Sequence, residues 1–390
     1  MRPLNRRSAS TSNFAVHVIH QGWRDIIQLG MDLTANNAAQ PRRVLIALMG
    51  AIGDVVRALP LAGRIRRAWP GCQIAWAVES KSAAILSGHP WIDELIVYDR
   101  ANAPWSFAPF LLRLRRGGFD LVIDLQRHLK SGFASFVSGA PDRLGFAAVN
   151  AKEFNYLFST RQIEPQPNLR SKLLQYQAFG DALGLPQAPI EFGLRSNPGE
   201  RARMAALLAE APDPILGVIL ASSWPSRIYF PAATAQAIRL LAKPADDSPA
   251  LFPILIGADD DVPLAKEVLA GLEGLPYLDL AGQTGLHELL ALFERCALAF
   301  GPDSGPMHIA AAVGCPVVSI WGATAAERSS PWGCAELAIK AEIPCYGCYL
   351  RQCPIDRECM RRISPAQIAA TVRRALQARR AIRAQESAAS

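Results

Sequence analysis

Half of this 390-residue chain is hydrophobic and 19% is charged, which is typical of a globular protein and excludes disorder over most of its length. The length is too great for one ordinary domain and predicts two. A formal net charge of +7 and a pI of about 9.1 favour an anionic partner, and leave nucleic acid, a membrane surface and a phosphorylated substrate open.

Residues 1–42 are expected to form an N-terminal extension with one amphipathic helix, which docks either on the protein's own surface or on a membrane. The residues that recur at helical spacing are Phe14, Val18, Gly22, Ile26, Leu29 and Leu33. No apolar run in the chain reaches the roughly 18 residues that a membrane span needs. Charged residues interrupt the first 33 residues, so no signal peptide is expected and the protein is expected in the cytoplasm.

From residue 43 onward, short apolar runs alternate with amphipathic segments. The first half is expected to contain strands at 44–48, 73–78, 94–98 and 120–125, and helices at 54–69, 81–87 and 107–116. Residues 184–214 are dense in Pro and Gly, which predicts a linker with one helix at 200–210. The alternation resumes with strands at 215–220, 252–256, 277–280, 298–300 and 317–321, and helices at 232–241, 262–272, 286–296 and 306–313. A helix rich in Arg is expected at 364–383.

This alternation is typical of α/β proteins, in which helices cover both faces of a parallel sheet. The chain therefore predicts two α/β halves of similar size, joined by a hinge, with a ligand cleft between the carboxyl edges of their sheets. We expect an extension at 1–42, an N-terminal domain at 43–195, a C-terminal domain at 196–363, and a closing helix and tail at 364–390.

A glycine-flanked turn follows the first predicted strand, where residues 49–54 read Met-Gly-Ala-Ile-Gly-Asp. Its two glycines, Gly50 and Gly53, let the backbone turn sharply and approach a ligand closely. The turn lacks the glycine pattern of dinucleotide-binding proteins, so a nicotinamide-dependent oxidoreductase is a poor match. Asp54 is expected either to cap the following helix or to serve as a general base at the carboxyl edge of the sheet.

A second turn joins a strand to a helix at residues 301–308, Gly-Pro-Asp-Ser-Gly-Pro-Met-His. Ser304 and Gly305 would expose backbone N–H groups at the positive end of the helix, which is an anion site. His308 lies in the first turn and could donate to a phosphate; the alternative is a simple cap at Asp303 or Ser304 with an incidental His. The combination favours phosphate binding.

A third loop, at the end of the strand at 215–220, contains Ser222, Ser223 and Arg227. Small hydroxyls followed by a cation are suited to binding a pyrophosphate. The loop lies at the same edge of the predicted sheet as residues 301–308, so the two are expected to share one ligand.

Three motifs occur in order: Gly53-Asp54-x4-Leu59-Pro60, Asp124-x-Gln126-x3-Lys130-Ser131 and Asp303-Ser304-Gly305-x2-His308. Over residues 43–375 the chain resembles the heptosyltransferase family, bacterial enzymes that add heptose to the inner core of lipopolysaccharide. The resemblance implies the GT-B fold, with two facing Rossmann-like domains and a cleft between them. It implies an N-terminal domain on the acceptor side and a C-terminal domain that binds the nucleotide sugar.

The resemblance also implies residue roles. Asp54 falls on the catalytic base, and Gly53, Lys130 and Ser131 fall on the acceptor side, where a solvated Lys130 is the alternative. Asp261 falls near the nucleoside, where a plain acidic loop is the alternative. Arg227 stands where the family usually has Lys, which keeps the charge and changes the geometry. The remaining donor-binding positions are Ser222, Ser223, Asp303, Ser304, Gly305 and His308.

The expected activity is an inverting transfer of a sugar, heptose from ADP-heptose by resemblance, to a lipopolysaccharide inner-core or related glycolipid acceptor. The alternatives are another sugar or acceptor within the family, or a nucleotide-sugar-binding protein without activity. No cofactor is required if cationic side chains and a helix N-terminus neutralise the phosphates, and no nucleic acid partner is expected.

A basic surface is expected to hold the protein on the cytoplasmic face of the inner membrane, near an anionic acceptor. Its candidate residues are Arg64, Arg66, Arg67, Arg113, Arg115 and Arg116, with a merely solvated face as the alternative.

Four cysteines lie within fifteen residues at Cys345, Cys348, Cys353 and Cys359. Such a group could hold zinc or an iron–sulfur cluster. The spacing is not that of two paired C-x2-C motifs, and reduced structural thiols are the alternative in a cytoplasmic protein.

Overall fold

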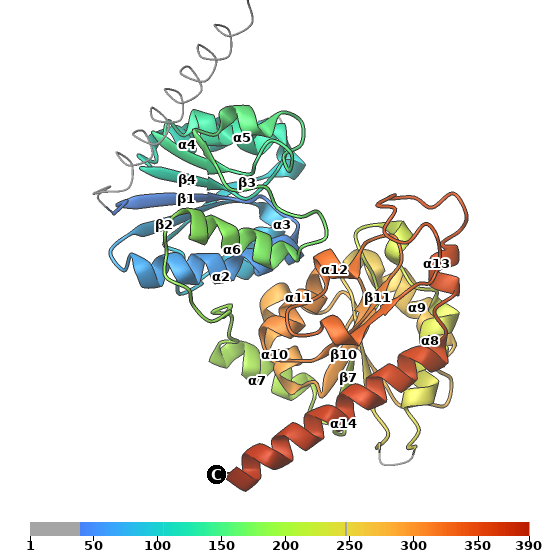
Figure 1. Ribbon diagram of the computed structural model, residues 1–390. Coiled ribbons are helices and arrows are strands. Elements are labelled where there is room, and N and C mark those ends of the chain that lie inside the picture. The colour runs from blue at the N-terminus through green and yellow to red at the C-terminus, as the bar shows by residue number, and fades with distance from the viewer. Residues whose placement is uncertain (1–39, 104, 246–247, 390) are drawn as a thin grey trace, which may run out of the picture. The chain divides into compact units, whose positions relative to one another are not determined.

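The computed structural model describes residues 40–103, 105–245 and 248–389, with side chains described up to residue 381 (Figure 1). The predicted amphipathic helix of the N-terminal extension lies outside these residues. Residues 42–390 form one compact unit. Within the described part of the chain, no helix is long and apolar enough to cross a membrane.

The first sheet has six parallel strands in the order β3-β2-β1-β4-β5-β6. Its strands are β1 (Arg43–Ala47), β2 (Gln73–Glu79), β3 (Glu94–Tyr98), β4 (Leu121–Asp124), β5 (Asp142–Gly145) and β6 (Arg161–Gln162). Its helices are α2 (Ile52–Ala68), α3 (Ser80–Ala83), α4 (Phe107–Arg116), α5 (Leu129–Val137) and α6 (Lys172–Ala182), with short 3-10 turns η1 (Ala84–Leu86), η2 (Arg100–Asn102) and η3 (Asn155–Phe158).

The second sheet also has six parallel strands, in the order β12-β11-β10-β7-β8-β9. Its strands are β7 (Ile215–Ile219), β8 (Phe252–Ile256), β9 (Leu278–Asp279), β10 (Leu298–Pro302), β11 (Val317–Trp321) and β12 (Ala338–Lys340). Its helices are α7 (Pro198–Leu207), α8 (Pro231–Leu241), α9 (Val262–Ala270), α10 (Leu286–Arg295), α11 (Gly305–Ala312), α12 (Ala326–Ser329), α13 (Glu358–Arg361) and α14 (Pro365–Ala389), and its 3-10 turns are η4 (Pro225–Arg227), η5 (Asp259–Asp261) and η6 (Ala335–Leu337).

Both sheets have the same topology when their strands are counted along the chain. In each, the first strand lies between the second and the fourth, so the order reverses beside β1 in one sheet and beside β7 in the other. In parallel sheets of this Rossmann-like order, the crevice at the reversal is where ligands bind, at the carboxyl ends of the strands. The predicted α/β class with two Rossmann-like halves is confirmed.

The two halves share one continuous hydrophobic core. A single cluster of buried side chains extends from Val44 on β1 through Leu59 on α2 to Met307 on α11 and Ile215 on β7. Helices α2 and α11 contact each other along this path. The core therefore runs through the helices between the sheets, and the domain boundaries expected at 195/196 and 363/364 stay predictions.

Two glycines let the N-terminal ends of α2 and α11 touch. A Cβ atom at Gly53 would lie 2.5 Å from Cδ2 of His308, and one at Gly305 would lie 3.1 Å from Cβ of Ile52. Real Cβ atoms do not approach other atoms as closely as the first distance. Glycine at position 53 is therefore required by the packing of the two helix ends, which brings Asp54 close to the second half.

Most predicted elements are present within a few residues, and the differences are local. The helix expected at 81–87 is a short α3 followed by η1, and α14 begins as expected but continues to Ala389. No element was predicted between residues 126 and 184, where the chain forms α5, β5, β6 and α6. Both of these strands are short, and α6 buries Gln175 and Gln177 as well as apolar residues, which weakens its amphipathic pattern.

Candidate active site

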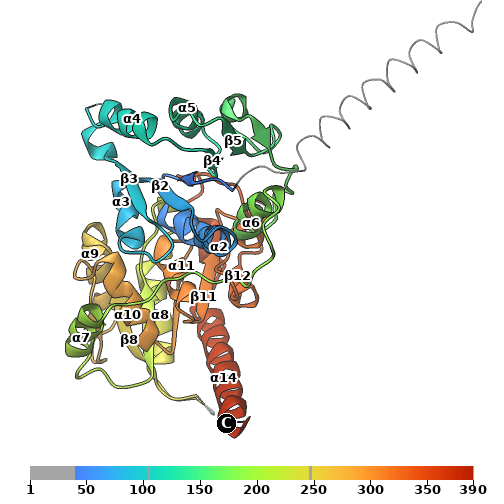
Figure 2. The same ribbon diagram turned by 90° about the vertical axis from the view of Figure 1, so that its left-hand side faces the viewer.

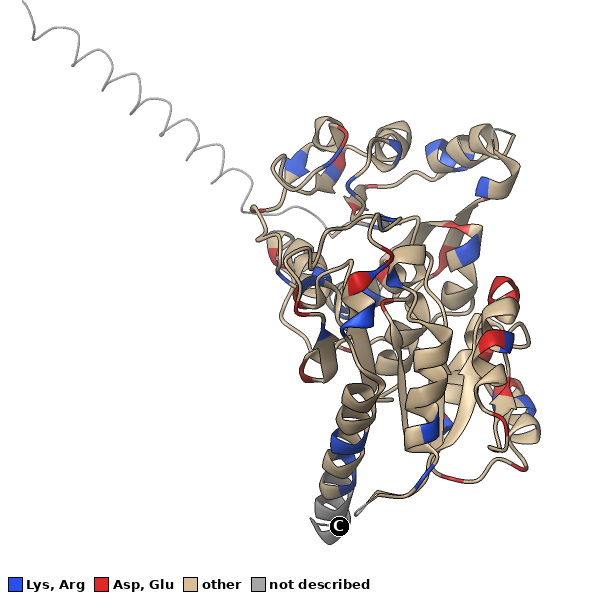
Figure 3. Cartoon of the chain, turned by 90° about the vertical axis from the view of Figure 1, so that its right-hand side faces the viewer, with Lys and Arg blue, Asp and Glu red and all other residues tan. Residues whose placement is uncertain are grey.

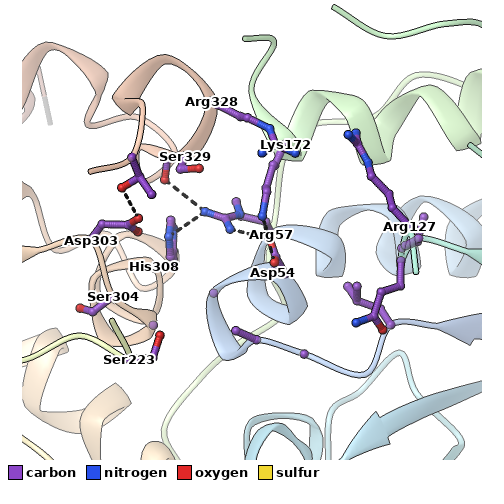
Figure 4. Close-up of a pocket in the computed structure, with 18 of the residues that line it drawn as sticks. Asp54, Arg57, Arg127, Lys172, Ser223, Asp303, Ser304, His308, Arg328 and Ser329 are labelled. Atoms are coloured by element: carbon purple, nitrogen blue, oxygen red, sulfur yellow. Dashed lines mark hydrogen bonds and ion pairs between the residues drawn. The ribbon is translucent and has the colours of Figure 1, made fainter. Parts of the chain in front are cut away.

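A cavity of about 320 Å³ lies at the carboxyl edges of the two sheets, where the first turns of α2 and α11 meet (Figure 4). From the first half it is lined by Gly53, Asp54, Arg57, Gln126, Arg127, His128, Lys152, Lys172 and Tyr176. From the second half it is lined by Ser223, Trp224, Arg227, Asp303, Ser304, Gly305, His308, Thr324, Arg328 and Ser329. The predicted cleft between the two halves is therefore present, and it contains the ends of all three sequence loops.

Asp54 is the third residue of α2, whose N-cap is Ala51, and its carboxylate bonds the side chains of Arg57 and Lys172. Its Oδ1 accepts from Nη2 of Arg57 at 2.5 Å, and Nζ of Lys172 lies 2.8 Å from Oδ1 and 3.0 Å from Oδ2. Burial alone would raise the pKa of this carboxyl group, but the charges and hydrogen bonds of Lys172 and Arg57 outweigh it and hold the pKa well below its usual range. Asp54 is thus an ionised carboxylate that faces the cavity, and the capping interpretation does not describe its side chain.

Arg57 links the two halves of the molecule. Its buried guanidinium donates from Nη1 to Nε2 of His308 at 2.8 Å and to the carbonyl oxygen of Ser329 at 3.1 Å, in addition to its contact with Asp54. Because arginine has no acceptor, Nε2 of His308 must accept, so the hydrogen of a neutral imidazole lies on Nδ1. Burial, together with the charge of Arg57, lowers the pKa of His308 well below its usual value, which agrees with a neutral ring.

Lys172 is the first residue of α6 and lies beside Asp54 in the cavity. Its pKa is lowered to about 8, mainly by burial and also by the charges of Arg57 and Arg328, while Asp54 opposes the shift. Neither Lys172 nor Arg57 was identified as a site residue from the sequence. Arg57 stands three residues after Asp54 on one face of a helix, a spacing that could have indicated the pair, whereas nothing local indicates Lys172.

The second half contributes an Arg–Asp pair at the cavity wall. Nη1 of Arg227 lies 3.2 Å from Oδ2 of Asp303, and its guanidinium lies 3.8 Å from the centre of the Trp224 ring. Thr324 donates to the same carboxylate oxygen at 2.7 Å. Burial lowers the pKa of Arg227, and the charge of Asp303 opposes the shift. The ring and the carboxylate therefore hold a charged guanidinium against the cavity.

The two predicted serines of the neighbouring loop have different places. Ser222 donates its hydroxyl to the backbone carbonyl of Asp303 at 2.5 Å, which ties the two loops together, and Ser223 lines the cavity. Only Ser223 of the pair is in the cavity wall.

Ser304 is the N-cap of α11 and is buried at the cavity wall. Its backbone N–H lies 3.1 Å from Sδ of Met307, and its Oγ has no hydrogen-bond partner. A buried hydroxyl without a partner costs free energy unless a ligand or a water satisfies it. Together with the free N–H groups at the start of α11, it forms a polar surface suited to a phosphate oxygen.

Besides Ser222, three residues expected in the site do not line the cavity: Asp261, Lys130 and Ser131. The carboxylate of Asp261 accepts from the backbone N–H of Ala258 at 2.8 Å, within η5. Lys130 pairs with Glu79 at 3.1 Å and lies 3.9 Å from the centre of the Tyr98 ring. These two side chains are therefore engaged in local contacts outside the cavity wall.

Ser131 belongs to a buried network around Asp124, which ends β4. Ser131 donates to Asp124 at 3.2 Å, and Asn155 donates to the same carboxylate at 2.9 Å. Burial raises the pKa of Asp124 to about 7. Asp124 also accepts from the backbone N–H of Gln126 at 3.0 Å, so the network anchors the loop at 126–128 that lines the cavity.

The cavity wall is strongly cationic. The charged residues that line it within the described part of the chain are the cations Arg57, Arg127, Lys152, Lys172, Arg227 and Arg328 and the carboxylates Asp54 and Asp303. This excess of positive charge suits an anionic ligand with more than one negative charge, such as a pyrophosphate.

The four clustered cysteines are all free thiols. Cys345 and Cys348 are exposed, Cys353 is half-buried, and Cys359 is buried, which raises its pKa. Among the residues that the structure describes, no three His, Cys, Asp or Glu side chains are grouped so that they could hold a metal ion. Metal binding by the four cysteines stays a prediction.

Two parallel Rossmann-like sheets with a cationic cavity at their carboxyl edges define a protein of the GT-B class. The structure of the ADP-heptose lipopolysaccharide heptosyltransferase II of Escherichia coli is similar, with a TM-score of 0.68 and 19% identity over 87% of this chain and 99% of that one. That of the E. coli heptosyltransferase WaaC with ADP-2-deoxy-2-fluoro heptose has a TM-score of 0.64 and 20% identity, over 85% and 98% of the two chains.

Residues 109–358 match the model of glycosyltransferase family 9 (heptosyltransferase), and the chain belongs to this family. It is a glycosyltransferase. A curated relative, the lipopolysaccharide core heptosyltransferase OpsX of Haemophilus influenzae, is 24% identical over 292 residues, which cover 75% of this chain and 82% of that protein.

Proposed function

We propose that this chain transfers heptose from ADP-heptose to a lipopolysaccharide inner-core or related glycolipid acceptor, with inversion at the anomeric carbon. The observation that carries the proposal is the meeting of the Asp54 carboxylate with the start of α11 and Arg227 in one cationic cavity. The family and the nucleotide sugar named with a similar structure support the choice of donor.

In the proposed complex, the pyrophosphate of the donor lies on the first turn of α11. Ser223, Ser304 and Arg227 line the cavity in which it would lie. Negative charge grows on the departing nucleoside diphosphate as the bond to the anomeric carbon breaks. Fixed donors and cations at that point stabilise the transition state more than the ground state.

The acceptor hydroxyl attacks the anomeric carbon from the opposite side and gives its proton to Asp54. The new C–O bond forms as the bond to the diphosphate breaks, so one displacement inverts the anomeric centre and releases ADP. Cationic side chains and helix N–H groups neutralise the charge of the leaving group in this scheme, and no step is assigned to a metal ion.

Asp54 needs a rise in its pKa before it can accept a proton efficiently, because Arg57 and Lys172 both hold its charge. Arg57 is also anchored by His308 and Ser329, whereas the ammonium group of Lys172 is a compact charge on a flexible stem. We propose that Lys172 is the cation that turns from Asp54 toward the phosphates when the donor binds, which leaves the carboxylate free to act as the base.

Incubation of the purified chain with ADP-heptose and a heptose-free lipopolysaccharide core acceptor tests the proposal. ADP release and the mass and anomeric configuration of the product are measured, with UDP- and GDP-sugars as controls. Transfer from ADP-heptose with inversion is expected. Transfer only from another sugar nucleotide contradicts the donor, a retained configuration contradicts the displacement, and tight ADP-heptose binding without turnover indicates a binding protein.

We also propose that the chain works at the cytoplasmic face of the inner membrane, where such an acceptor is held. The three arginines of α2 that were predicted to contact the membrane bond within the chain, and their membrane contact stays a prediction. Arg64 is buried and bonds Asp181 at 2.8 Å, Arg66 pairs with Asp93, and Arg67 pairs with Glu191 at 2.8 Å. These side chains attach α2 to the rest of the chain, and the remaining candidates Arg113, Arg115 and Arg116 lie on α4.

A further inference from the structure

Large apolar side chains gather at the surface of α5 and η3, on the first half of the chain. We call this the α5–η3 surface; the exposed fractions of its members are Leu129 48%, Phe133 39%, Phe136 55%, Phe154 68% and Leu157 68%. Contiguous apolar patches of this kind are uncommon on soluble proteins unless they bind something.

The members of the α5–η3 surface adjoin one another. The two elements α5 and η3 contact each other, and Phe158 connects them, because its ring centre lies 6.3 Å from that of Phe133 and 6.1 Å from that of Phe136. Helix α4 lies beside α5 in both views of the ribbon and contacts it (Figure 2).

The backbone that presents Phe154 is strained. Glu153 and Phe154 have φ angles of 51° and 58°, in the left-handed region that residues with a side chain rarely adopt. Such conformations persist only where the surroundings impose them, and they cluster at functional sites. Here the strained residues present a mostly exposed aromatic ring, so the conformation does not serve to bury it.

Basic residues lie on α4, which contacts α5, and in the segment that precedes η3 (Figure 3). Lys152 is exposed next to Glu153, and Arg115 and Arg116 are exposed on α4. The guanidinium of Arg143 lies 5.8 Å from the centre of the Phe136 ring. Aromatic and aliphatic side chains among cations suit an interface with anionic lipid, where rings enter the headgroup region and cations meet phosphates.

The α5–η3 surface continues directly from the wall of the cavity. His128 and Lys152 line the cavity, and Leu129 and Phe154 follow them in the chain. The backbone N–H of Lys152 donates to the carbonyl of Arg127 at 2.7 Å, and Asn155 donates to the carbonyl of His128 at 2.9 Å. The two loops therefore form one piece, which lines the cavity at His128 and Lys152 and carries exposed apolar side chains at Leu129 and Phe154.

We propose that the α5–η3 surface seats the protein on an anionic lipid bilayer, so that a membrane-held acceptor reaches the cavity past His128 and Lys152. The inference rests on the proposed glycolipid acceptor. The docking surface is thus distinct from the arginines of α2, whose side chains bond within the chain.

The test uses the full chain and flotation with vesicles of equal parts phosphatidylglycerol and phosphatidylcholine, or of phosphatidylcholine alone, without donor or acceptor. The double variant Phe154→Ser/Leu157→Ser removes two exposed side chains outside the cavity wall. Tyr277→Ser/Ile355→Ser, at positions 42% and 54% exposed in the second half, is the matched control.

The wild type is expected to bind the anionic vesicles, and more weakly at high salt. The double variant is expected to bind them at least about tenfold more weakly, because even partial insertion of two large apolar side chains contributes that much. The control variant is expected to bind like the wild type. Unchanged flotation of the double variant, or equal binding of the wild type to both kinds of vesicle, overturns the proposal.

Other occupants of the α5–η3 surface have their own signatures, and each also overturns the proposal. A second copy of the chain is the occupant if the wild type sediments as a dimer and the double variant sediments as a monomer. The chain's own residues 1–41 are the occupant if the double variant makes them more sensitive to protease.

A transfer assay separates this proposal from the proposed function. The double variant should keep the wild-type rate with a core acceptor that lacks its lipid, and lose rate with the same acceptor in vesicles. Absence of transfer by the wild type with either acceptor contradicts the proposed function, while flotation still decides the docking surface.

Discussion

Arg57 donates a hydrogen bond to Nε2 of His308 over 2.8 Å, across the boundary between the two halves of the molecule. Its other terminal nitrogen contacts Asp54, so one guanidinium touches both the proposed base and the helix of the proposed phosphate site. A change in donor occupancy at α11 can therefore affect the charge environment of the base through a single side chain.

Replacement of Asp54 by Asn should lower turnover by about 10²- to 10⁴-fold and leave ADP binding close to that of the wild type, because the amide cannot take up the proton. Steady-state transfer rates and calorimetry with ADP measure the two quantities. Turnover close to that of the wild type would remove Asp54 from the role of base.

Replacement of Arg57 by Met should move the acid limb of kcat/KM to higher pH. A base must be ionised, so activity falls as the pH drops through the pKa of Asp54; loss of one neighbouring cation raises that pKa. The other charged or titratable groups around Asp54 are Lys172, Tyr176, Arg127, Arg227 and His308.

The matched control for Arg57→Met is Arg66→Met, on the same helix, where the side chain pairs with Asp93 at 2.5 Å and does not line the cavity. If both variants lose thermal stability and neither alters the pH profile, Arg57 has only a structural role.

Replacement of Lys172 by Arg should abolish an alkaline limb of the activity profile near pH 8. The pKa of Lys172 is lowered from 10.5 to about 8, so the wild-type ammonium loses its proton, and with it its attraction for the phosphates, as the pH rises through that value. Arginine stays charged throughout this range. A limb that persists in Lys172→Arg belongs to another group.

Replacement of Arg227 by Ala should weaken the binding of ADP and of the whole donor by about 1–3 kcal/mol, the range for hydrogen bonds to charged groups. Acceptor affinity should hardly change. Arg351→Ala is the control. The guanidinium of Arg351 lies 5.8 Å from the centre of the Trp224 ring, which Arg227 also contacts, but Arg351 does not line the cavity. Equal ADP affinity of both variants and the wild type, measured by calorimetry, would place the phosphates elsewhere.

Replacement of Gly53 by Ala should destabilise the protein by about 1–3 kcal/mol, because the new methyl group would meet the His308 ring 2.5 Å away. Gly71→Ala is the control, since a Cβ atom there has nothing within 4 Å. Thermal unfolding compares the variants. An equal melting temperature for Gly53→Ala and the wild type would mean that α2 and α11 can separate at little cost.

Much of the fold was predictable because its signals are local. Apolar runs such as residues 215–219 and 252–256 are buried in the second sheet and end at turn residues. The elements at 126–184 were not predicted, because β5 and β6 are short and α6 carries buried glutamines. Local patterns therefore did not indicate which of these residues are buried by the rest of the chain.

The residues of the candidate site also divide into those with a local sequence signal and those without one. Asp54, Ser304 and His308 were predicted because each lies at the start of a helix that follows a turn from a strand, and the parallel topology brings such turns to one edge. Lys130 and Asp261 were predicted by family position alone, and their side chains bond Glu79 and Ala258 outside the cavity wall.

The sequence by itself determined the alternation of strands and helices, the turns that carry Asp54 and His308, and the family to which they point, because these depend on neighbours along the chain. The tertiary structure decided how those residues are charged. Lys172 reaches Asp54 across 118 positions of sequence, and Arg57 reaches His308 across 251. Contacts over such separations arise only when two packed halves bring distant helices together, and in that low-dielectric setting they shift the pKa values on which the proposed chemistry depends.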